Sequence, residues 1–584
     1  MKKNKWLFFF LLGLAGVNAA QSQSQPNIVL ILADDMGWGD LGMHKNPVIE
    51  TPVLDRLAQQ GAQFERFFVS PLCAPTRASL LTGRYHLRTG VASVTGGLET
   101  MRSNEVTLAE VFRKAGYTTG AFGKWHNGAH YPENPQGQGF QEFFGFCGGH
   151  WTNYVNTTLQ HNGNEVKTKG YITDVLTDAA LSFIDQNKNK PFFCYIPYNA
   201  PHGPFQVPDS YFDKYKAKGV ADREAAIYGM VDNMDGNIGR VLRKLDELNL
   251  SNNTIVIFMT DNGPNSVRYN GAMKGIKGSV DEGGIRVPLF IRWPGEISAK
   301  TIVKPISAHI DLLPTLAELA GIGQPATLPL DGKSLAPLLR NKLKAWPERM
   351  LFTHVLKTDT NHSINPYLGA VRTARYRFIR GKEADQLYDM RNDPGQKTDI
   401  ASQKPDIVQV LRQQYDNWFA DVMQQGIHPE VTQVGYAQSS ITELFAPDAA
   451  KEGQLAYFAK NGFAHDWFTG WQHPNDAAVW KIDVVEPGSY RVSLRYNCPA
   501  GFVGNPMQVI IAGKTLEKPI EKAFVGTLHS SPDRVKRIEA FEKDWATVEL
   551  GQVALPKGTH VLRVQGESRA TAPFELLSVF VEKL

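Results

Sequence analysis

Short apolar runs alternate with amphipathic segments along about the first 340 residues of the chain. The apolar runs lie at residues 27–33, 118–122, 192–198, 254–260 and 287–291. Between them, apolar residues recur with helical spacing at residues 52–60, 108–114, 173–185 and 223–248. Apolar strands that alternate with helices predict an α/β domain over residues 26–340, in which helices sandwich a large, mostly parallel sheet.

The pattern changes at about residue 345. Residues 345–425 contain three short strand candidates and then one long helical pattern, at 351–355, 369–372, 376–380 and 406–423. This order predicts a small α+β subdomain with an antiparallel sheet. Residues 426–444 are polar and lack a clear period, which is typical of a linker.

From residue 445 onward, apolar and polar residues alternate with a period of two. The alternation at 480–484 and 490–496, separated by Pro487-Gly488, predicts a hairpin, and residues 556–558 predict another turn. We expect an all-β, sandwich-like domain over residues 445–584. It is either a structural appendage or a carbohydrate-binding module, and exposure of Trp467, Phe468 and Trp471 would favour the second interpretation.

The first 19 residues have the features of a secretory signal peptide. Lysines at positions 2, 3 and 5 precede an apolar run over residues 6–17, and Val17-Asn18-Ala19 offers small residues for cleavage. The run is shorter than the about 20 residues that a membrane-spanning helix needs. We therefore expect a secreted or periplasmic protein with no integral membrane segment in the mature chain. A retained membrane anchor is the alternative.

The composition is that of an ordinary globular protein. Hydrophobic residues make up 42% of the 584 residues and charged residues 21%. The formal net charge is only +4, which argues against a nucleic-acid partner because such proteins carry a basic stripe. Four cysteines are too few for a disulfide framework.

Chemically competent side chains follow four of the predicted strands. They are Asp34-Asp35, Lys124 with His126, His202, and Asp261-Asn262. In open α/β sheets, ligands bind beyond the carboxyl ends of the strands, so we expect these side chains to share one site. The carboxylate and amide oxygens select Ca²⁺ or Mg²⁺ rather than zinc, for which the sequence has neither an HExxH motif nor paired CxxC spacing.

Cationic side chains near such a metal would select an anion such as sulfate or phosphate. The candidates are Arg77, Lys124, His126, His202 and Lys277. The segment Cys73-Ala74-Pro75-Thr76-Arg77 is the sharpest local feature, because Pro75 suits the first turn of a helix. Cys73 would then lie at a helix N-terminus, which favours an anion, and an unmodified thiol there could act as a nucleophile of low pKa.

The run from Cys73 to Arg84 resembles the signature of the type I, formylglycine-dependent sulfatases, within the alkaline-phosphatase-like superfamily. Four further blocks match in order, at residues 27–41, 123–126, 200–204 and 261–263. Lys277, five residues before Glu282-Gly283-Gly284, matches the pocket lysine of the family better than its neighbour Lys274 does. The resemblance covers residues 26–425 and leaves out the β-rich region.

The resemblance implies a mechanism. Cys73 would be oxidised to formylglycine by a formylglycine-generating or sulfatase-maturating enzyme, and the hydrate would attack sulfur and form a covalent sulfo-enzyme. The implied Ca²⁺ ligands are Asp34, Asp35, Asp261, Asn262 and the modified residue 73. His202 with Lys277 would protonate the leaving alcohol, and His126 would deprotonate the second hydroxyl. Arg77 and Lys124 would hold the diol and the sulfate.

The resemblance does not identify the alcohol to which the sulfate is attached. The loop over residues 127–154 contains His130, His150, Trp151 and Asn153, which either contact substrate or pack within the loop. For an exported sulfatase with an appended sandwich, we expect the substrate to be a sulfated carbohydrate. The sulfate removed would be of galactose or hexosamine type and would lie at a chain end. The alternatives are an arylsulfatase on small aromatic sulfates, a phosphonate monoester or phosphodiester hydrolase, and a glycan-binding protein with an inactive hydrolase domain.

Overall fold

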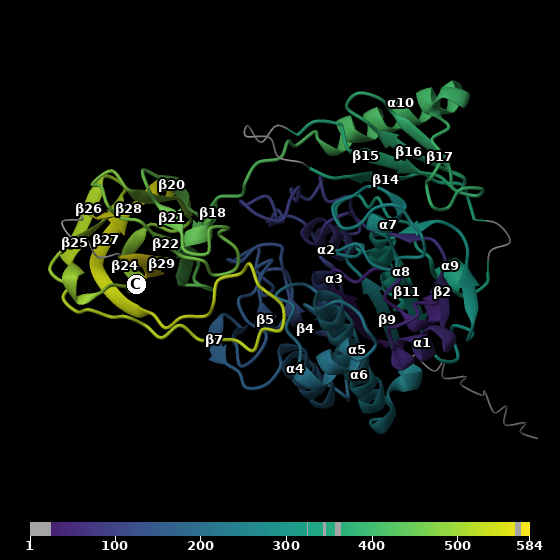
Figure 1. The fold of residues 1–584 in the computed structure, drawn as a ribbon, viewed down its shortest axis with the longest axis horizontal. Coiled ribbons are helices and arrows are strands. Elements are labelled where there is room, and N and C mark those ends of the chain that lie inside the picture. Colours follow the sequence, from purple (N-terminus) through teal and green to yellow (C-terminus); the bar gives the residue numbers. More distant parts are fainter. Residues whose placement is uncertain (1–24, 324, 343–345, 357–363, 567–573) are drawn as a thin grey trace, which may run out of the picture.

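The computed structural model describes residues 25–323, 325–342, 346–356, 364–566 and 574–584. An α/β region carries a small subdomain on one side, and a β sandwich lies at the far end of the molecule (Figure 1). The predicted signal peptide, residues 1–19, lies outside the described residues. Among the residues that are described, no helix is both long and apolar enough to span a membrane.

A ten-stranded sheet forms the centre of the α/β region as described. Its strand order is β12-β2-β11-β9-β1-β8-β4-β5-β6-β7. The strands are β1 (Asn27–Ala33), β2 (Ala62–Phe64), β4 (Thr118–Lys124), β5 (Glu142–Phe146), β6 (Thr158–His161), β7 (Asn164–Lys167), β8 (Phe192–Pro197), β9 (Thr254–Thr260), β11 (Leu289–Arg292) and β12 (Thr301–Val303). The central strands β9, β1, β8, β4 and β5 run parallel, as predicted. Toward the edges, β11, β6 and β7 pair antiparallel.

The predicted strand over residues 287–291 is in fact two strands. Pro288 separates β11 from β10 (Arg286–Val287), which pairs with β3 (Phe67–Phe68) in a small sheet completed by β13 (Ser307–Ala308). Because proline has no N–H to donate, a single hydrogen-bonded strand cannot run through it in the middle of a sheet.

Helices cover both faces of the large sheet. They are α1 (Pro52–Gln59), α2 (Cys73–Thr82), α3 (Leu108–Lys114), α4 (Ile172–Gln186), α5 (Asp209–Lys216), α6 (Asp222–Glu247), α8 (Leu312–Leu319) and α9 (Ala336–Leu339), whereas the short helix α7 (Glu282–Ile285) packs toward the small subdomain. Leu30 of β1 packs toward α2, α3 and α8, whereas the next residue, Ile31, packs toward α1, α4 and α6. Burial on both faces explains why the central strands are continuously apolar rather than alternating.

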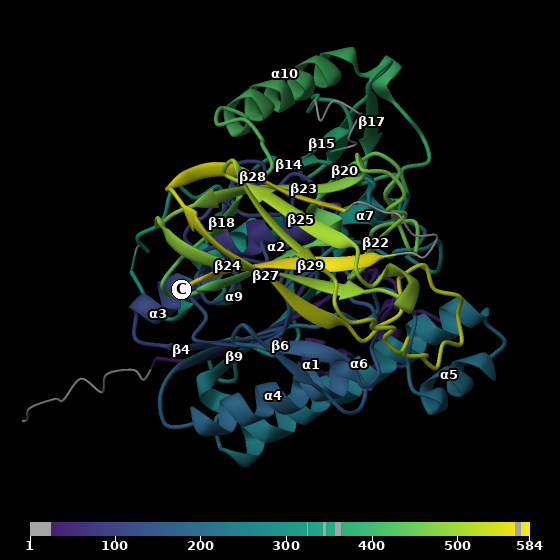
Figure 2. The same ribbon diagram turned by 90° about the vertical axis from the view of Figure 1, so that its left-hand side faces the viewer.

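The small subdomain has the predicted α+β form. Its antiparallel sheet has the order β14 (Leu351–His354), β15 (Gly369–Arg372), β16 (Tyr376–Arg380) and β17 (Gln386–Asp389). The helix α10 (Pro405–Val422) lies across this sheet and buries Tyr415 and Trp418 against its apolar face (Figure 2).

The C-terminal region is a two-sheet β sandwich, also as predicted. One sheet has the order β18-β23-β28-β25-β26 with β20 beside β23, and the other β21-β22-β29-β24-β27 with β19 beside β29. The strands are β18 (Thr432–Val434), β19 (Ile441–Phe445), β20 (Ala450–Glu452), β21 (Ala456–Tyr457), β22 (Phe468–Thr469), β23 (Ala477–Val484), β24 (Gly488–Asn497), β25 (Pro506–Ile511), β26 (Lys514–Pro519), β27 (Ala546–Leu555), β28 (Gly558–Gly566) and β29 (Glu575–Lys583).

Three details of the sandwich differ from the sequence-based expectation. Pro487-Gly488 is not a hairpin turn, because β23 and β24 belong to different sheets, and the turn after β27 likewise crosses between sheets. The segment 426–444 is not only a linker, since β18 and part of β19 lie within it. Trp467, Phe468 and Trp471 are at most 3% exposed and belong to packed clusters, so they form no exposed binding platform.

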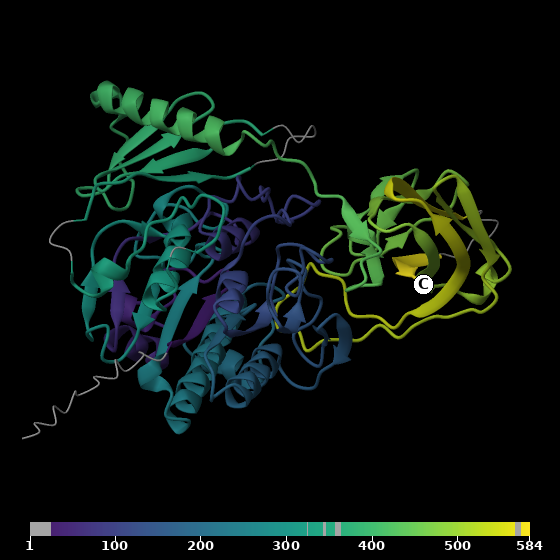
Figure 3. The ribbon, with the colours of Figure 1, turned by 180° about the vertical axis from the view of Figure 1, so that it is seen from behind.

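The sandwich is attached to the α/β region by more than the chain connection. The residues between β26 and β27, 520–545, form a long loop that reaches from the sandwich to the α/β region, drawn in yellow in Figure 1 and in the rear view of Figure 3. We call these residues the docking segment. In it, Arg537 donates to the carbonyl of Thr152 (2.7 Å), and Glu542 accepts from the hydroxyl of Thr158 (2.7 Å).

A buried ion cluster joins the small subdomain to the α/β region. Glu282, at the start of α7, accepts from Arg377 of β16 (Nη2–Oε2 2.6 Å) and from Arg372 of β15 (Nε–Oε2 3.3 Å). Burial alone would raise the pKa of Glu282, but these arginines outweigh it and lower the pKa to about 2. Glu282 is therefore charged at neutral pH and fixes the loop that leads to it.

We expect Glu282→Ala to destabilise the protein by about 3–5 kcal/mol, because it leaves two guanidinium groups buried without their carboxylate. Asp222→Ala, which breaks the exposed Lys216–Asp222 pair, is the control and should cost less than about 1 kcal/mol. Urea unfolding at pH 7 measures both. A Glu282→Ala effect no larger than that of the control would show that this cluster does not hold the two parts together.

Candidate active site

Side chains from four neighbouring strands meet at the carboxyl edge of the parallel sheet. Because β9, β1, β8 and β4 are adjacent in the sheet, the residues that follow them lie at one edge. These are Asp34 and Asp35 after β1, Lys124 and His126 at the end of β4, His202 after β8, and Asp261 and Asn262 after β9, all of them buried. The structure brings the predicted strand-end residues together.

Cys73 is the first residue of α2, a helix that is buried along its whole length. The Sγ of Cys73 and carboxylate oxygens of Asp34 and Asp261 all lie within 4.8 Å of one another. Arg77 lies one turn later on the same side of the helix. Its guanidinium donates to Asp261 (Nη2–Oδ2 2.9 Å) and to the carbonyl of Lys124 (2.7 Å), so α2 carries both the thiol and a fixed positive charge into the site.

Two lysines neutralise two of the carboxylates. Lys124 donates to Asp34 (Nζ–Oδ2 2.7 Å), and Lys277 pairs with Asp35 (Nζ–Oδ1 2.6 Å). Burial alone would raise the pKa of both carboxyls, but the lysines and the neighbouring cationic groups outweigh it and lower both pKa values. Asp34 and Asp35 are therefore ionised at neutral pH.

The third carboxyl, that of Asp261, lacks such compensation. Burial and the nearby Asp34 raise the pKa of Asp261 to about 7, although Arg77 opposes this. A further positive charge would be needed to keep all three carboxyls fully ionised in so small and dry a volume.

The oxygens of this site fit a hard divalent cation. Asp34 Oδ1 and Asn262 Oδ1 are buried and have no hydrogen-bond partner among the described residues, whereas the amide nitrogen of Asn262 donates to Asp35 (2.8 Å). Leaving such an acceptor unpaired costs about 1–3 kcal/mol unless a ligand satisfies it. Carboxylate and amide oxygens are the ligands that Ca²⁺ takes in proteins. Asp34, Asp35, Asp261, Asn262 and residue 73 could therefore hold this ion.

The structure distinguishes the two candidate lysines. Lys277 lies beside the acidic cluster, whereas Lys274 pairs with Asp281 (3.4 Å) and donates to the Tyr388 hydroxyl (3.1 Å). Burial alone would lower the pKa of Lys277, but Asp35 and its neighbours raise it. Its ammonium group is therefore charged at neutral pH.

His126 is held so that one ring nitrogen is free. It has a left-handed backbone (φ 64°), and its Nε2 donates to the carbonyl of Val94 (3.0 Å). Its buried Nδ1 has no partner among the residues described. Burial and Lys124 lower its pKa well below the usual value, so the ring is neutral and Nδ1 can accept a proton. Residue 149 is glycine because a Cβ there would lie 2.1 Å from Nε2 of this ring.

His202 lies beside the acidic cluster, close to Asp34 and Asp35. Its Nδ1 donates to the carbonyl of Gly203 (2.8 Å), which leaves Nε2 3.7 Å from Asp35 Oδ2. Burial lowers the pKa of His202 to about 4, although the carboxylates oppose this. The ring of His150 packs edge-on against it (4.5 Å between centroids), and His150 Nε2 lies 3.6 Å from Glu539 of the docking segment.

The predicted substrate loop has a mixed outcome. His150 and Trp151 line the same cavity as Cys73, which has a volume of about 280 Å³ and which we call the strand-end cavity. His130 and Asn153 instead bind the sandwich: His130 donates to the carbonyl of Glu443 (2.8 Å), and Asn153 accepts from the hydroxyl of Ser531 (2.7 Å). His130 and Asn153 are thus engaged by hydrogen bonds to the sandwich and the docking segment rather than by the cavity.

The sandwich supplies part of the wall of the strand-end cavity, which the sequence did not indicate. The lining residues include Phe445, Asp448, Phe463 and His465, together with Glu99 from the α/β region. A loop with the composition Gly-Phe-Ala-His at positions 462–465 combines an aromatic and an imidazole ring, and this was the only hint in the sequence.

Comparisons with known proteins agree with this geometry. The family model "Sulfatase" matches residues 26–322, and "N-sulphoglucosamine sulphohydrolase, C-terminal" matches residues 277–421. The N-acetylgalactosamine-6-sulfatase of Canis lupus familiaris is 34% identical, over 57% of this chain and 70% of its own length. Arylsulfatase A of Homo sapiens is 33% identical, over 66% and 86%. The crystal structure of Ps i-CgsB in complex with k-i-k-neocarrahexaose is 30% identical, with a TM-score of 0.64 over 70% of this chain and 95% of that one.

We expect Ca²⁺ to bind the wild-type protein and to raise its Tm, because a ligand that binds only the folded state stabilises it by about 2.7 kcal/mol at a hundred times Kd. Asp34→Asn removes a charge and Asn262→Ala removes a neutral oxygen, so both should weaken binding by at least about tenfold, the first more than the second. Calorimetric titration of chelator-treated protein measures the affinity.

Asp246→Asn, on the exposed end of α6, is the control and should bind Ca²⁺ as the wild type does. Equal Ca²⁺ affinities in the wild type, Asp34→Asn, Asn262→Ala and Asp246→Asn would show that any calcium site lies elsewhere.

Proposed function

The chain belongs to the sulfatase family and is a sulfuric ester hydrolase, and we propose that it removes sulfate from a sulfated carbohydrate by means of a formylglycine made from Cys73. The observation that carries the proposal is the position of Cys73. It opens α2 among Asp34 and Asp261, and it lines a cavity together with His126, His202 and Lys277.

The surroundings of Cys73 argue against the unmodified thiol as the nucleophile. Burial raises the pKa of the Cys73 thiol, although Lys124 and Lys277 oppose this, so the thiol is protonated at neutral pH. A protonated thiol is a weak nucleophile. An aldehyde hydrate at this position would instead offer oxygen to a hard metal ion and to sulfur. The aldehyde requires a separate maturation enzyme, which is part of the proposal.

The other residues divide the remaining work. Asp34, Asp35, Asp261, Asn262 and residue 73 would hold Ca²⁺. When bound, this ion polarises the sulfate oxygens and favours ionisation of an attached hydroxyl. Arg77 and Lys124 supply fixed positive charge beside the sulfate. Lys277, whose ammonium group is charged, donates to the leaving oxygen beside His202, and Nδ1 of His126 accepts the proton that allows sulfate to depart.

A carbohydrate suits the rest of the strand-end cavity. Phe463 offers an apolar ring to a sugar, and the carboxyls of Glu99 and Asp448 can accept hydrogen bonds from hydroxyls. Relatives named for N-acetylgalactosamine 6-sulfate support this class of substrate. We propose that the protein is exported, in keeping with residues 1–19 and with a glycan substrate outside the cell.

The peptide that contains residue 73, from protein made in a host with a maturation enzyme, should be about 18 Da lighter than the thiol form, as expected for conversion of the thiol to an aldehyde. Cys73→Ala should lose essentially all sulfatase activity while its Tm stays near that of the wild type. Mass spectrometry and hydrolysis of 4-nitrophenyl sulfate measure the two effects. Fully active protein with an unmodified thiol, or an active Cys73→Ala variant, would contradict the mechanism.

Lys277→Ala should lower kcat/KM on a sulfate ester by at least about 100-fold, because it removes a charged donor beside the reacting group. Lys274→Ala is the matched control, three residues away and paired outside the cluster, and should change kcat/KM by less than about threefold. Steady-state kinetics on 4-nitrophenyl sulfate decide this. Similar losses in both variants would indicate a general disturbance of the loop rather than a role for Lys277.

A further inference from the structure

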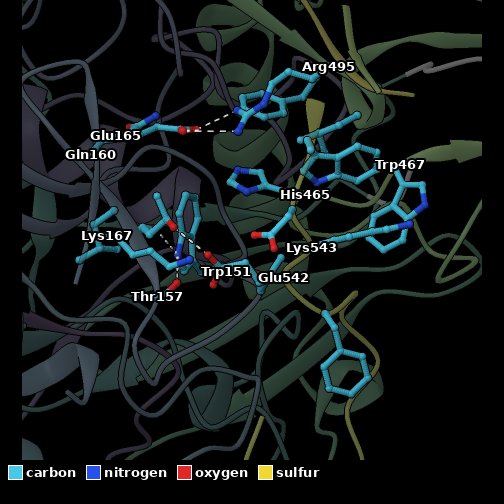
Figure 4. A pocket seen from close by; sticks show the side chains of 18 residues that line it. Trp151, Thr157, Gln160, Glu165, Lys167, His465, Trp467, Arg495, Glu542 and Lys543 are labelled. Atoms are coloured by element: carbon cyan, nitrogen blue, oxygen red, sulfur yellow. Dashed lines mark hydrogen bonds and ion pairs between the residues drawn. The ribbon is translucent and has the colours of Figure 1, made fainter. Parts of the chain in front are cut away.

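A second cavity lies between the β6–β7 hairpin and the sandwich (Figure 4), with a volume of about 260 Å³. We call it the interdomain cavity. We propose that it binds an uncharged sugar ring of the same glycan whose sulfated sugar occupies the strand-end cavity. The proposal rests on the proposed function, because it deepens the choice of a carbohydrate as the substrate.

The two cavities are neighbours that share a wall. Trp151, Gln160, Phe445 and His465 line both of them. His465 stacks on Phe445 (4.7 Å between centroids, 8° between planes) and meets Trp151 edge-on (4.4 Å). A layer of these rings therefore separates the two cavities, and neighbouring sugars of one chain would occupy its two sides.

The charges around the interdomain cavity balance. Its lining includes three basic side chains, Lys167, Arg495 and Lys543, and three acidic ones, Glu165, Glu542 and Asp544. A cavity that selects an anion needs an excess of positive charge in its lining, which this cavity lacks. Alternating donors and acceptors instead match the hydroxyl groups of an uncharged sugar.

Aromatic side chains provide the apolar part of the lining. Trp467 and Trp545 meet edge-on (5.2 Å between centroids), and the ammonium group of Lys543 lies over both rings at 5.3 and 5.4 Å. Phe541 adds a further ring. Rigid rings beside polar groups bind ligands that have both C–H faces and hydroxyls, at a small cost in conformational entropy.

Some donors in the lining are free, whereas others are occupied. Arg495 is held between Glu165 and Glu443 (2.9 Å each), so it braces the cavity (Figure 4). By contrast, Lys167 at the end of β7 is exposed and makes no ion pair with any described residue. Lys167 is therefore available as a donor to a ligand, whereas the indole N–H of Trp467 is buried.

The cavity exists only because the sandwich is docked. Its lining combines residues 151–167 of the α/β region with strands and loops of the sandwich and with the end of the docking segment. Ligand sites occur preferentially at such domain interfaces. The Glu165–Arg495 pair crosses this interface and joins residues 330 positions apart in the sequence.

The test compares a long and a short substrate. The double variant Lys167→Ala/Trp545→Ala should raise KM about tenfold for sulfated hexasaccharides of galactose or N-acetylhexosamine, through the loss of one hydrogen bond and one ring contact. Its kcat should stay within about twofold, and its kcat/KM on 4-nitrophenyl sulfate should not change, because neither side chain lines the strand-end cavity. Lys169→Ala, exposed and two residues beyond Lys167, is the control and should behave as the wild type on both substrates.

A second measurement does not depend on turnover. Uncharged hexasaccharides of the same sugars, titrated into the wild type with tryptophan fluorescence as the readout, should bind, and the double variant should bind them at least about tenfold more weakly. Absence of binding to the wild type, unchanged KM in the double variant, or an equal loss on both substrates would overturn the proposal. Hydrolysis of 4-nitrophenyl sulfate but of no sulfated sugar would instead refute the proposed substrate class, and the binding measurement would still decide on the cavity.

Discussion

The site depends on keeping three carboxyl groups together in a volume that excludes water. Asp34, Asp35 and Asp261 arrive from two adjacent strands, and in a dry interior they would repel one another and take up protons. Lys124, Lys277 and Arg77 offset this repulsion from three further elements of the chain. Three parts of the fold hold these charges next to one another. They are the strand order, the buried helix α2 and the loop before α7. A hard cation would complete the balance that the side chains leave unfinished at Asp261.

Much of the α/β region could be predicted because its signals are local. A continuous apolar run marks a strand that is buried on both faces, and β1 and β9 begin and end where the pattern indicates. The site residues could be predicted because each directly follows such a strand or lies in a short block of fixed spacing. Pro288 is the exception, since its missing N–H divides one apolar run between two sheets.

The sandwich was less predictable because alternation defines which face of a strand is buried and not which strand lies beside it. At Pro487-Gly488 the alternation suggested a hairpin, but the chain there crosses from one sheet to the other. The same limit applies to the docking of the sandwich. His130 and Asn153 are polar loop residues of a kind that suits a sugar equally well, and only the fold reveals that they bind Glu443 and Ser531. Contacts between residues hundreds of positions apart leave no periodic trace in a sequence.

The attachment of the sandwich at more than one place has a mechanical consequence. A single covalent connection after α10 would leave the sandwich free to swing, and any cavity that it borders would open and close with that motion. The docking segment adds a second anchor at a separate place, through Arg537 and Glu542. Two separate anchors remove the rotation about a single hinge, so the borders of both cavities stand in place before a ligand arrives. The two domains therefore lose their relative freedom when the protein folds and not when a ligand binds. The cavity walls, which come from distant parts of the chain, are already fixed for the ligand.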